Sequence, residues 1–222
     1  MKPHRNLPIR RAGQPVEQAS GAMILLHGKG ANADNLVALS ELLDCDSIAY
    51  LAPQAEDRVW FPRGVTDPIA RNQPHVSASL DFINGVVQAL GEYGIPRHRI
   101  VLMGFCQGAC LALEYVVSKP ARYGAVFALS GALLGSDEGL DHRKGDLEGT
   151  PIFLGSSDID FMVPRTRVLA SGEVLRRSNA EVTERLYPGM PHTINEEEVD
   201  AIRDALEHLF RPPEPETGAD RL

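Results

Sequence analysis

The 222-residue chain has few cysteines and few basic residues. It has only three cysteines, Cys45, Cys106 and Cys110, without paired or CxxC spacing. We therefore expect neither a disulfide framework nor a metal site, and a reducing, cytoplasmic location. Basic residues are also scarce, with 22 Lys and Arg against 30 Asp and Glu. The net charge of −8 argues against nucleic acid as a partner.

Long apolar stretches are missing as well. No run approaches the roughly 20 residues that a membrane-spanning helix needs, and the first twenty residues carry charges and prolines. We expect neither a membrane span nor a signal peptide. The composition, 43% hydrophobic and 23% charged, is that of a globular protein. At this length it predicts a single domain over residues 1–210, followed by a disordered tail at 211–222 that is rich in Pro, Glu and Gly.

Short apolar runs alternate along the chain with segments of helical period. Strands are predicted at 22–26, 47–51, 99–103, 125–129, 151–154 and 182–187. Helices are predicted at 32–43, 76–93, 107–118, 164–177 and 196–210, with an irregular, proline-containing segment at 54–74. This alternation indicates an α/β fold with a mostly parallel sheet and helices on both faces. Ligands of such sheets bind outside the carboxyl ends of the strands, so residues that follow strands are the candidates for chemistry.

Residues 104–108 follow one predicted strand and open a helix. Their sequence, Gly-Phe-Cys-Gln-Gly, is the G-x-S-x-G nucleophile elbow with Cys106 in place of serine. The two glycines let strand and helix approach closely, and the helix N-terminus favours a thiolate at Cys106. A small buried cysteine in a tight turn gives the same pattern. The interpretation of Cys106 as a nucleophile therefore depends on a base and an acid elsewhere in the chain.

His192 is the candidate base, because it follows the last predicted strand and precedes the last helix. Two aspartates, Asp158 and Asp160, follow the strand at 151–154. Either could accept a hydrogen bond from the imidazole, and the other would then cap a helix or organise its loop. The chain order nucleophile, acid, histidine is that of α/β-hydrolases. His27 follows the first core strand, and we expect it to order the loop there.

Together these motifs resemble the phospholipase/carboxylesterase family, which includes bacterial carboxylesterases and acyl-protein thioesterases. The resemblance covers residues 22–210 and is carried, in family order, by residues 26–30, 52–54, 60–62, 104–109, 160–164 and 187–192. It implies an α/β-hydrolase fold, a Ser-Asp-His type of hydrolase without metal or cofactor, and a homodimer. It also places the triad acid at Asp160 and an oxyanion hole at the backbone N–H groups of Lys29 and Gln107.

Five further side chains are candidates for substrate binding. Trp60 and Phe61 lie in the irregular segment and would form a wall of the acyl pocket. Met162 and Met190 lie beside the loops that carry the acid and the base, and Gln73 would add a polar group to the cleft. Ordinary core packing accounts equally well for the two aromatic and two methionine side chains.

The chain departs from the family at two positions. Cys106 stands where the family has serine; a thiolate is more nucleophilic but leaves more readily, so thioesters, activated esters and lactones suit it better than alkyl esters. Dienelactone hydrolases, another α/β-hydrolase group, use such a Cys-Asp-His triad. At Lys29 the family often has an apolar residue, so we expect positive charge at the cleft mouth and an anionic or polar substrate.

The leading hypothesis is hydrolysis of a small ester or thioester through an acyl-enzyme. Three alternatives stay open: a dienelactone-type lactone hydrolase, an acyltransferase, and a non-hydrolytic scaffold that binds a small molecule or an acylated partner. An engineered serine-to-cysteine replacement would give the same sequence.

Overall fold

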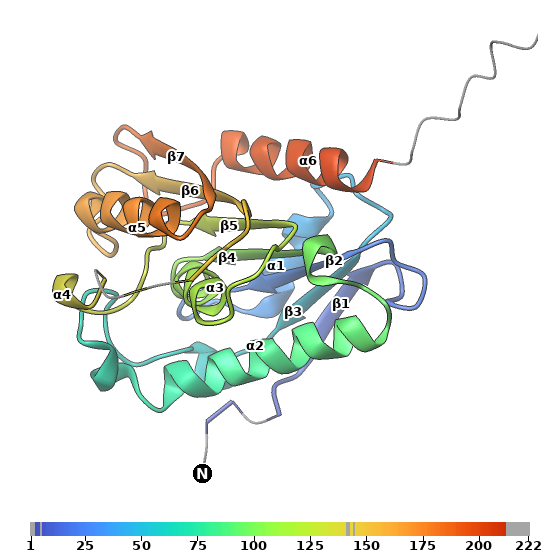
Figure 1. The fold of residues 1–222 in the computed structure, drawn as a ribbon, viewed down its shortest axis with the longest axis horizontal. Coiled ribbons are helices and arrows are strands. Elements are labelled where there is room, and N and C mark those ends of the chain that lie inside the picture. The colour runs from blue at the N-terminus through green and yellow to red at the C-terminus, as the bar shows by residue number, and fades with distance from the viewer. Residues whose placement is uncertain (1–2, 5, 141–142, 144, 212–222) are drawn as a thin grey trace, which may run out of the picture.

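The structure, a computed structural model, describes residues 3–4, 6–140, 143 and 145–211. Its seven-stranded sheet has the order β1-β3-β2-β4-β5-β6-β7 (Figure 1). The strands from β3 to β7 in this order are parallel, and β1 pairs antiparallel with β3 at the edge. This mostly parallel sheet with flanking helices confirms the predicted α/β-hydrolase fold. The predicted disordered tail, apart from Arg211, lies outside the described residues.

The sequence pattern locates most of these elements. The strands are β1 (Ile9–Gly13), β2 (Ala22–Leu26), β3 (Ala49–Pro53), β4 (Ile100–Phe105), β5 (Ala125–Leu129), β6 (Pro151–Ser157) and β7 (Glu181–Tyr187). The helices are α1 (Ala33–Ser40), α2 (His75–Glu92), α3 (Gln107–Ser118), α4 (Asp137–Leu140), α5 (Arg165–Arg177) and α6 (Glu196–Phe210). Short 3-10 helices lie at Glu56–Arg58, Ile69–Asn72 and Arg97–Arg99. Strands β2, β3 and β5 are buried at every position, as expected for parallel strands covered on both faces.

Helices cover both faces of the sheet because successive strand residues point to opposite sides. Ile24 of β2 belongs to an apolar cluster with residues of α2, α3 and α5. Its neighbours Met23 and Leu25 belong to a second cluster with residues of α1 and α6. The sheet therefore separates two cores, one under each layer of helices (Figure 1).

Two elements were not predicted from the sequence, β1 and the short helix α4. Strand β1 has the sequence Ile-Arg-Arg-Ala-Gly and three exposed positions, so it lacks the apolar run by which the central strands are recognised. Helix α1 is shorter than predicted and begins after Asn32, whose side chain accepts from the backbone N–H of Asn35 in a capping box.

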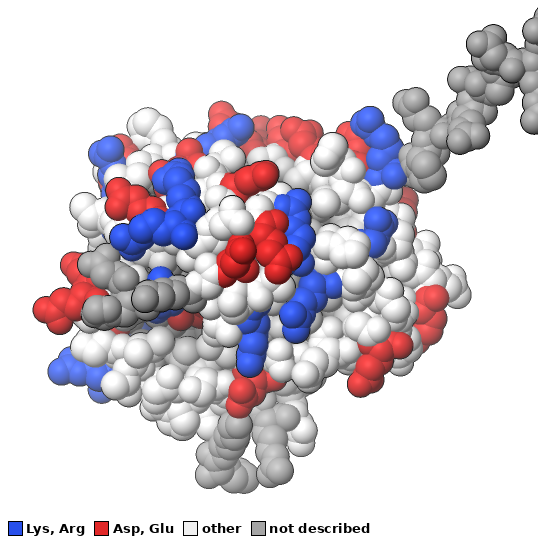
Figure 2. Space-filling view, viewed as in Figure 1, with Lys and Arg blue, Asp and Glu red and all other residues white. Residues whose placement is uncertain are grey.

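Charged side chains of both signs are interspersed on the face shown in Figure 2. That face carries no wide surface of Lys and Arg, in keeping with the acidic net charge. Within the described part of the chain, no helix combines the length and the apolar character needed to cross a membrane.

Candidate active site

Three loops at the carboxyl edge of the sheet carry the residues predicted to form a triad. Cys106 follows β4 directly, Asp160 lies in the loop after β6, and His192 lies in the loop after β7. These strands run parallel in one sheet, so their carboxyl ends meet at the same edge.

The turn between β4 and α3 holds Cys106 in a strained backbone conformation, with φ 54° and ψ −116°. Its N–H donates to the carbonyl of Leu129 on the neighbouring strand, at 2.9 Å. A Cβ on Gly104 would lie 2.2 Å from the carbonyl carbon of Gly108, and one on Gly108 would lie 1.9 Å from the carbonyl oxygen of Leu26. The elbow therefore needs glycine at both positions because backbone occupies the space of a side chain.

A short hydrogen bond joins the candidate base to a buried carboxylate. Nδ1 of His192 lies 2.6 Å from Oδ2 of Asp160, whose side chain is 0% exposed. The carboxylate can only accept, so the proton resides on Nδ1 and Nε2 is directed to the reaction. The other carboxylate oxygen, Oδ1, accepts from the backbone N–H groups of Met162 and Val163, at 2.8 and 3.0 Å. The aspartate is thus fixed by its own loop.

The second aspartate of this loop occupies a different place. Oδ1 of Asp158 accepts from the backbone N–H of Gly189, at 2.8 Å, and its own N–H donates to the carbonyl of Tyr187. It ties the loop after β6 to the loop that carries His192. Of the two aspartates left open by the residue pattern, Asp160 contacts the imidazole and Asp158 organises the loops.

The environment of His192 raises its pKa to about 9. The largest cause is the hydrogen-bonding influence of the Cys106 side chain; burial acts in the opposite direction, and Asp160 raises the pKa further. Nε2 is buried and makes no hydrogen bond of ordinary geometry with any described residue. The sulfur of Cys106 and the carboxylate of Asp160 thus both favour the imidazolium form of His192.

Cys110 lies one helical turn after Cys106 and differs from it chemically. Burial raises the pKa of Cys110 to about 12, so this cysteine stays a neutral thiol at physiological pH. It packs inside the core cluster of α3. Only Cys106 stands beside a base.

The two residues expected to supply the oxyanion hole, Lys29 and Gln107, line the same cavity as Cys106. Gln107 is the first residue of α3, and a helix supplies no acceptor for the N–H groups of its first turn. The loop that carries Lys29 passes close to the nucleophile, since a Cβ on Gly28 would lie 3.2 Å from the Cβ of Cys106. The N–H of Gly30 donates to the carbonyl of Arg58 and fixes the far side of this loop.

His27 orders the same loop. Its Nε2 accepts from the backbone N–H of Ala55 at 3.0 Å and lies 3.0 Å from the amide nitrogen of Gln54. Nδ1 therefore carries the proton and donates to the carbonyl of Gly28, at 2.7 Å. Burial lowers the pKa of His27, so the ring stays neutral. The indole N–H of Trp60 donates to the carbonyl of His27, at 2.8 Å.

The side chain of Gln107 has a structural part that the sequence pattern did not reveal. Its Oε1 accepts from the backbone N–H of Trp60 at 3.0 Å, and its Nε2 donates to the carbonyl of Phe61 at 2.7 Å. Asn72, which is fully buried, accepts from the N–H of Arg63 at 2.8 Å. Gln107 thus fastens the irregular segment against the elbow, and Asn72 braces that segment internally. No local motif marks Gln107, because its partners are backbone groups 46 and 47 residues away in the sequence.

A cavity of about 150 Å³ opens beside Cys106. Eleven residues line it: Lys29, Phe61, Pro62, Arg63, Gly64, Val65, Cys106, Gln107, Cys110, Met162 and Val163. Phe61 and Met162, two of the candidate substrate-binding residues, are part of this wall.

Three other expectations about the cleft are not met. Trp60 is 0% exposed and packs behind the cavity wall, where its indole holds the loop of His27. Gln73 is exposed and caps α2 through hydrogen bonds to the N–H and hydroxyl of Ser77. Met190 is absent from the cavity wall, and its sulfur accepts from the side-chain amide of Asn195.

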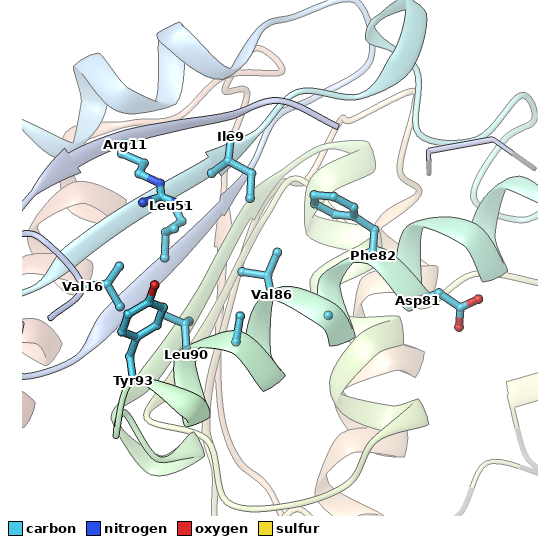
Figure 3. A pocket seen from close by; sticks show the side chains of 11 residues that line it. Ile9, Arg11, Val16, Leu51, Asp81, Phe82, Val86, Leu90 and Tyr93 are labelled. Atoms are coloured by element: carbon cyan, nitrogen blue, oxygen red, sulfur yellow. The ribbon is translucent and has the colours of Figure 1, made fainter. Parts of the chain in front are cut away.

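A second cavity, of about 400 Å³, lies between β1 and α2 (Figure 3). Its wall is mainly apolar, and its ionisable side chains are those of Arg11, Asp81 and Tyr93. It contains no cysteine, serine or histidine and does not adjoin the elbow. Among the described residues, no group of three or more His, Cys, Asp and Glu side chains is arranged to hold a metal ion.

The sheet, the strained strand-to-helix turn and the buried histidine–aspartate pair define an α/β-hydrolase. A family model described as Phospholipase/Carboxylesterase matches residues 9–210, and the chain belongs to this family. It is 36% identical to a phospholipase/carboxylesterase of known structure from Dyadobacter fermentans, with a TM-score of 0.88 over 93% of this chain and 98% of that one.

Curated relatives carry the same family resemblance. The chain is similar to acyl-protein thioesterase 1 of Saccharomyces cerevisiae, at 32% identity over 90% of this chain and 94% of that protein. The corresponding protein of Gibberella zeae is 29% identical over 89% and 94%. The structure of esterase PE8, at 21% identity and a TM-score of 0.77, shares the fold. The chain is therefore a hydrolase of an esterase and thioesterase family.

Proposed function

We propose that this hydrolase cleaves thioesters and activated carboxylic esters through a covalent acyl-enzyme on Cys106. His192 moves the proton, Asp160 orients His192, and the backbone N–H groups of Lys29 and Gln107 stabilise the oxyanion. The observation that carries the proposal is the joint placement of Cys106 in the strained elbow and of His192 on the buried Asp160 carboxylate.

The reaction follows from these positions. The Cys106 thiolate attacks the carbonyl carbon, and the carbonyl oxygen takes the electron pair as an oxyanion beside the two N–H groups. The intermediate collapses, the bond to the leaving group breaks, and the imidazolium of His192 gives its proton to that group. Water then attacks the acyl carbon while neutral His192 accepts a proton from it. Loss of the Cys106 thiolate from the second intermediate releases the acid and restores the thiolate beside the imidazolium of His192.

The sulfur favours particular substrates. After attack on an alkyl ester, the intermediate loses thiolate more readily than alkoxide and returns to substrate. A thioester releases a thiolate of similar basicity, so its intermediate also collapses forward. Thioesters are therefore the preferred class, and the acyl-protein thioesterase relatives support that choice.

The test compares one acyl group on two leaving groups, a thiol and p-nitrophenol, in four proteins. Wild type and Cys45→Ala, the matched control at a cysteine remote from the site, are expected to turn over both substrates. Cys106→Ala is expected to lose about 1,000-fold or more in kcat/KM because no nucleophile remains. Undiminished turnover in Cys106→Ala would overturn the proposal. Cys106→Ser is expected to show a lower thioester-to-ester ratio than wild type.

A further inference from the structure

The cavity beside Cys106 is apolar at its base and positively charged at its mouth. At the base lie Phe61, Val65, Cys110 and Val163, all less than 9% exposed. At the mouth lie the exposed residues of the wall, which include Lys29 and Arg63. These two are the only Lys, Arg, Asp or Glu residues in the wall. A basic mouth is a local exception in a chain with a net charge of −8.

Both mouth cations are free to meet a substrate. Neither Lys29 nor Arg63 forms an ion pair with another described residue. The carboxylate next to the wall is that of Asp67, which accepts from the N–H of Gly64 and pairs with Arg71 at 3.6 Å. Its charge is thus engaged with its own loop.

The backbone at Arg63 is held firmly, which fixes the point at the mouth from which its side chain extends. The N–H of Arg63 donates to buried Asn72, at 2.8 Å. On either side, Gln107 holds the carbonyl of Phe61 and the carbonyl of Val65 accepts from the N–H of Gly135, at 2.9 Å. A rigid wall loses little conformational entropy when it binds an anion.

This cavity takes the acyl part of the substrate. The leaving group must lie near Nε2 of His192 to receive its proton, and His192 is not part of the cavity wall. Cys106 is only 7% exposed, so an acyl chain attached to its sulfur extends from the buried base toward the mouth. A volume of about 150 Å³ accommodates a guest of roughly six carbon atoms.

We infer that this site selects short acyl groups that end in a carboxylate, such as monothioesters of dicarboxylic acids of about six carbons. The methylene chain would pack on the apolar base, and the terminal carboxylate would meet Arg63 and Lys29 at the mouth. Arg63 can bind a carboxylate through two N–H groups. The inference rests on the proposed function, whose acyl-enzyme on Cys106 fixes where the chain begins.

The experiment compares thioesters of one uncharged thiol, N-acetylcysteamine, that differ only at the far end of the acyl chain. Adipoyl carries a carboxylate where hexanoyl has a methyl group. In wild type we expect kcat/KM to favour adipoyl by about fivefold, the size of a partly exposed ion pair. Arg63→Gln is expected to lower this ratio toward one, Arg63→Lys to restore part of it, and Arg63→Gln combined with Lys29→Gln to bring it to about one. The same change of charge in Arg97→Gln, before β4 at the opposite end of the sheet, is expected to keep the wild-type ratio.

Two further arms separate the possible failures. Hexanoyl glutathione carries its negative charge on the leaving group. If the enzyme prefers it to hexanoyl N-acetylcysteamine but shows no preference for the adipoyl thioester, the inference is overturned and the anion lies on the leaving-group side. Calorimetry with adipic monoamide and hexanamide measures the same selectivity without turnover, and equal affinities would also overturn it. If Cys106 forms a hexanoyl adduct but the adipoyl-to-hexanoyl ratio of kcat/KM is one or less, only this inference is refuted. Full turnover in Cys106→Ala would refute the proposed function instead.

Discussion

The coupling between Cys106 and His192 can be tested by removing the sulfur. The environment raises the pKa of His192 from 6.5 to about 9, first through the Cys106 side chain. A rise of this size corresponds to roughly 3 kcal/mol of preferential stabilisation of the imidazolium. In Cys106→Ala only Asp160 remains to raise the pKa, and burial lowers it. We expect the pKa of His192 to fall by at least about one, or 1.4 kcal/mol.

The assay is a titration of the His192 ring by NMR in wild type and Cys106→Ala, with His192→Gln to assign the signal. The upward direction of the His192 pKa shift also sets how the stability of the folded protein depends on pH. Because the folded pKa exceeds the unfolded value, the contribution of His192 is present below about pH 6.5 and is lost as the pH rises through about 9. A His192 pKa that stays near 9 in Cys106→Ala would refute the coupling between Cys106 and His192 and leave Asp160 as the source of the raised pKa.

Three further substitutions, one of them with a matched control, test the structure around the site. Gly108→Ala places a Cβ 1.9 Å from the carbonyl oxygen of Leu26 and should cost more than about 3 kcal/mol in urea unfolding, whereas Gly85→Ala, in open space on α2, should gain about 0.5 kcal/mol. Burial raises the pKa of Glu198 to about 7, so the folded protein loses stability between pH 4.5 and 7 as this carboxyl ionises. Glu198→Gln should therefore raise the Tm at pH 8 and not at pH 4. Gln107→Ala frees the loop of the cavity wall and should lower kcat/KM about tenfold.

Each of these would be contradicted by a simple result. Wild-type stability of Gly108→Ala would mean that the elbow is looser than its contacts indicate. An equal change of Tm at both pH values would show that Glu198 is not ionised at a buried position. Unchanged kcat/KM in Gln107→Ala would separate the position of the loop from catalysis.

The parts of this fold that sequence predicts are those whose pattern is local. The continuous apolar residues of β2 and β5 mark buried parallel strands, and the glycines around Cys106 mark the elbow, because both signals lie within a few neighbouring residues. Strand β1 was not predicted because two arginines occupy this exposed edge strand, where no apolar pattern is required. Edge strands pair through backbone groups that any side chain leaves available.

The candidate site divides in the same way. Cys106, an acid and His192 follow from strand order, yet residue order alone leaves Asp158 and Asp160 equivalent. What separates them is the path of the loop, which turns Asp160 onto the imidazole and Asp158 onto the N–H of Gly189. The direction of a side chain also explains Gln73, which accepts a hydrogen bond from Ser77 in the first turn of α2 and does not line the cavity.

The central claim is that the acyl group passes through the sulfur of Cys106. Its most direct test is mass spectrometry of the protein quenched in acid during turnover of a slowly hydrolysed thioester. We expect one acyl group per chain, on the peptide that contains Cys106, in wild type and in Cys45→Ala, and none in Cys106→Ala. An acyl group on another residue, or full turnover of Cys106→Ala, would contradict the mechanism.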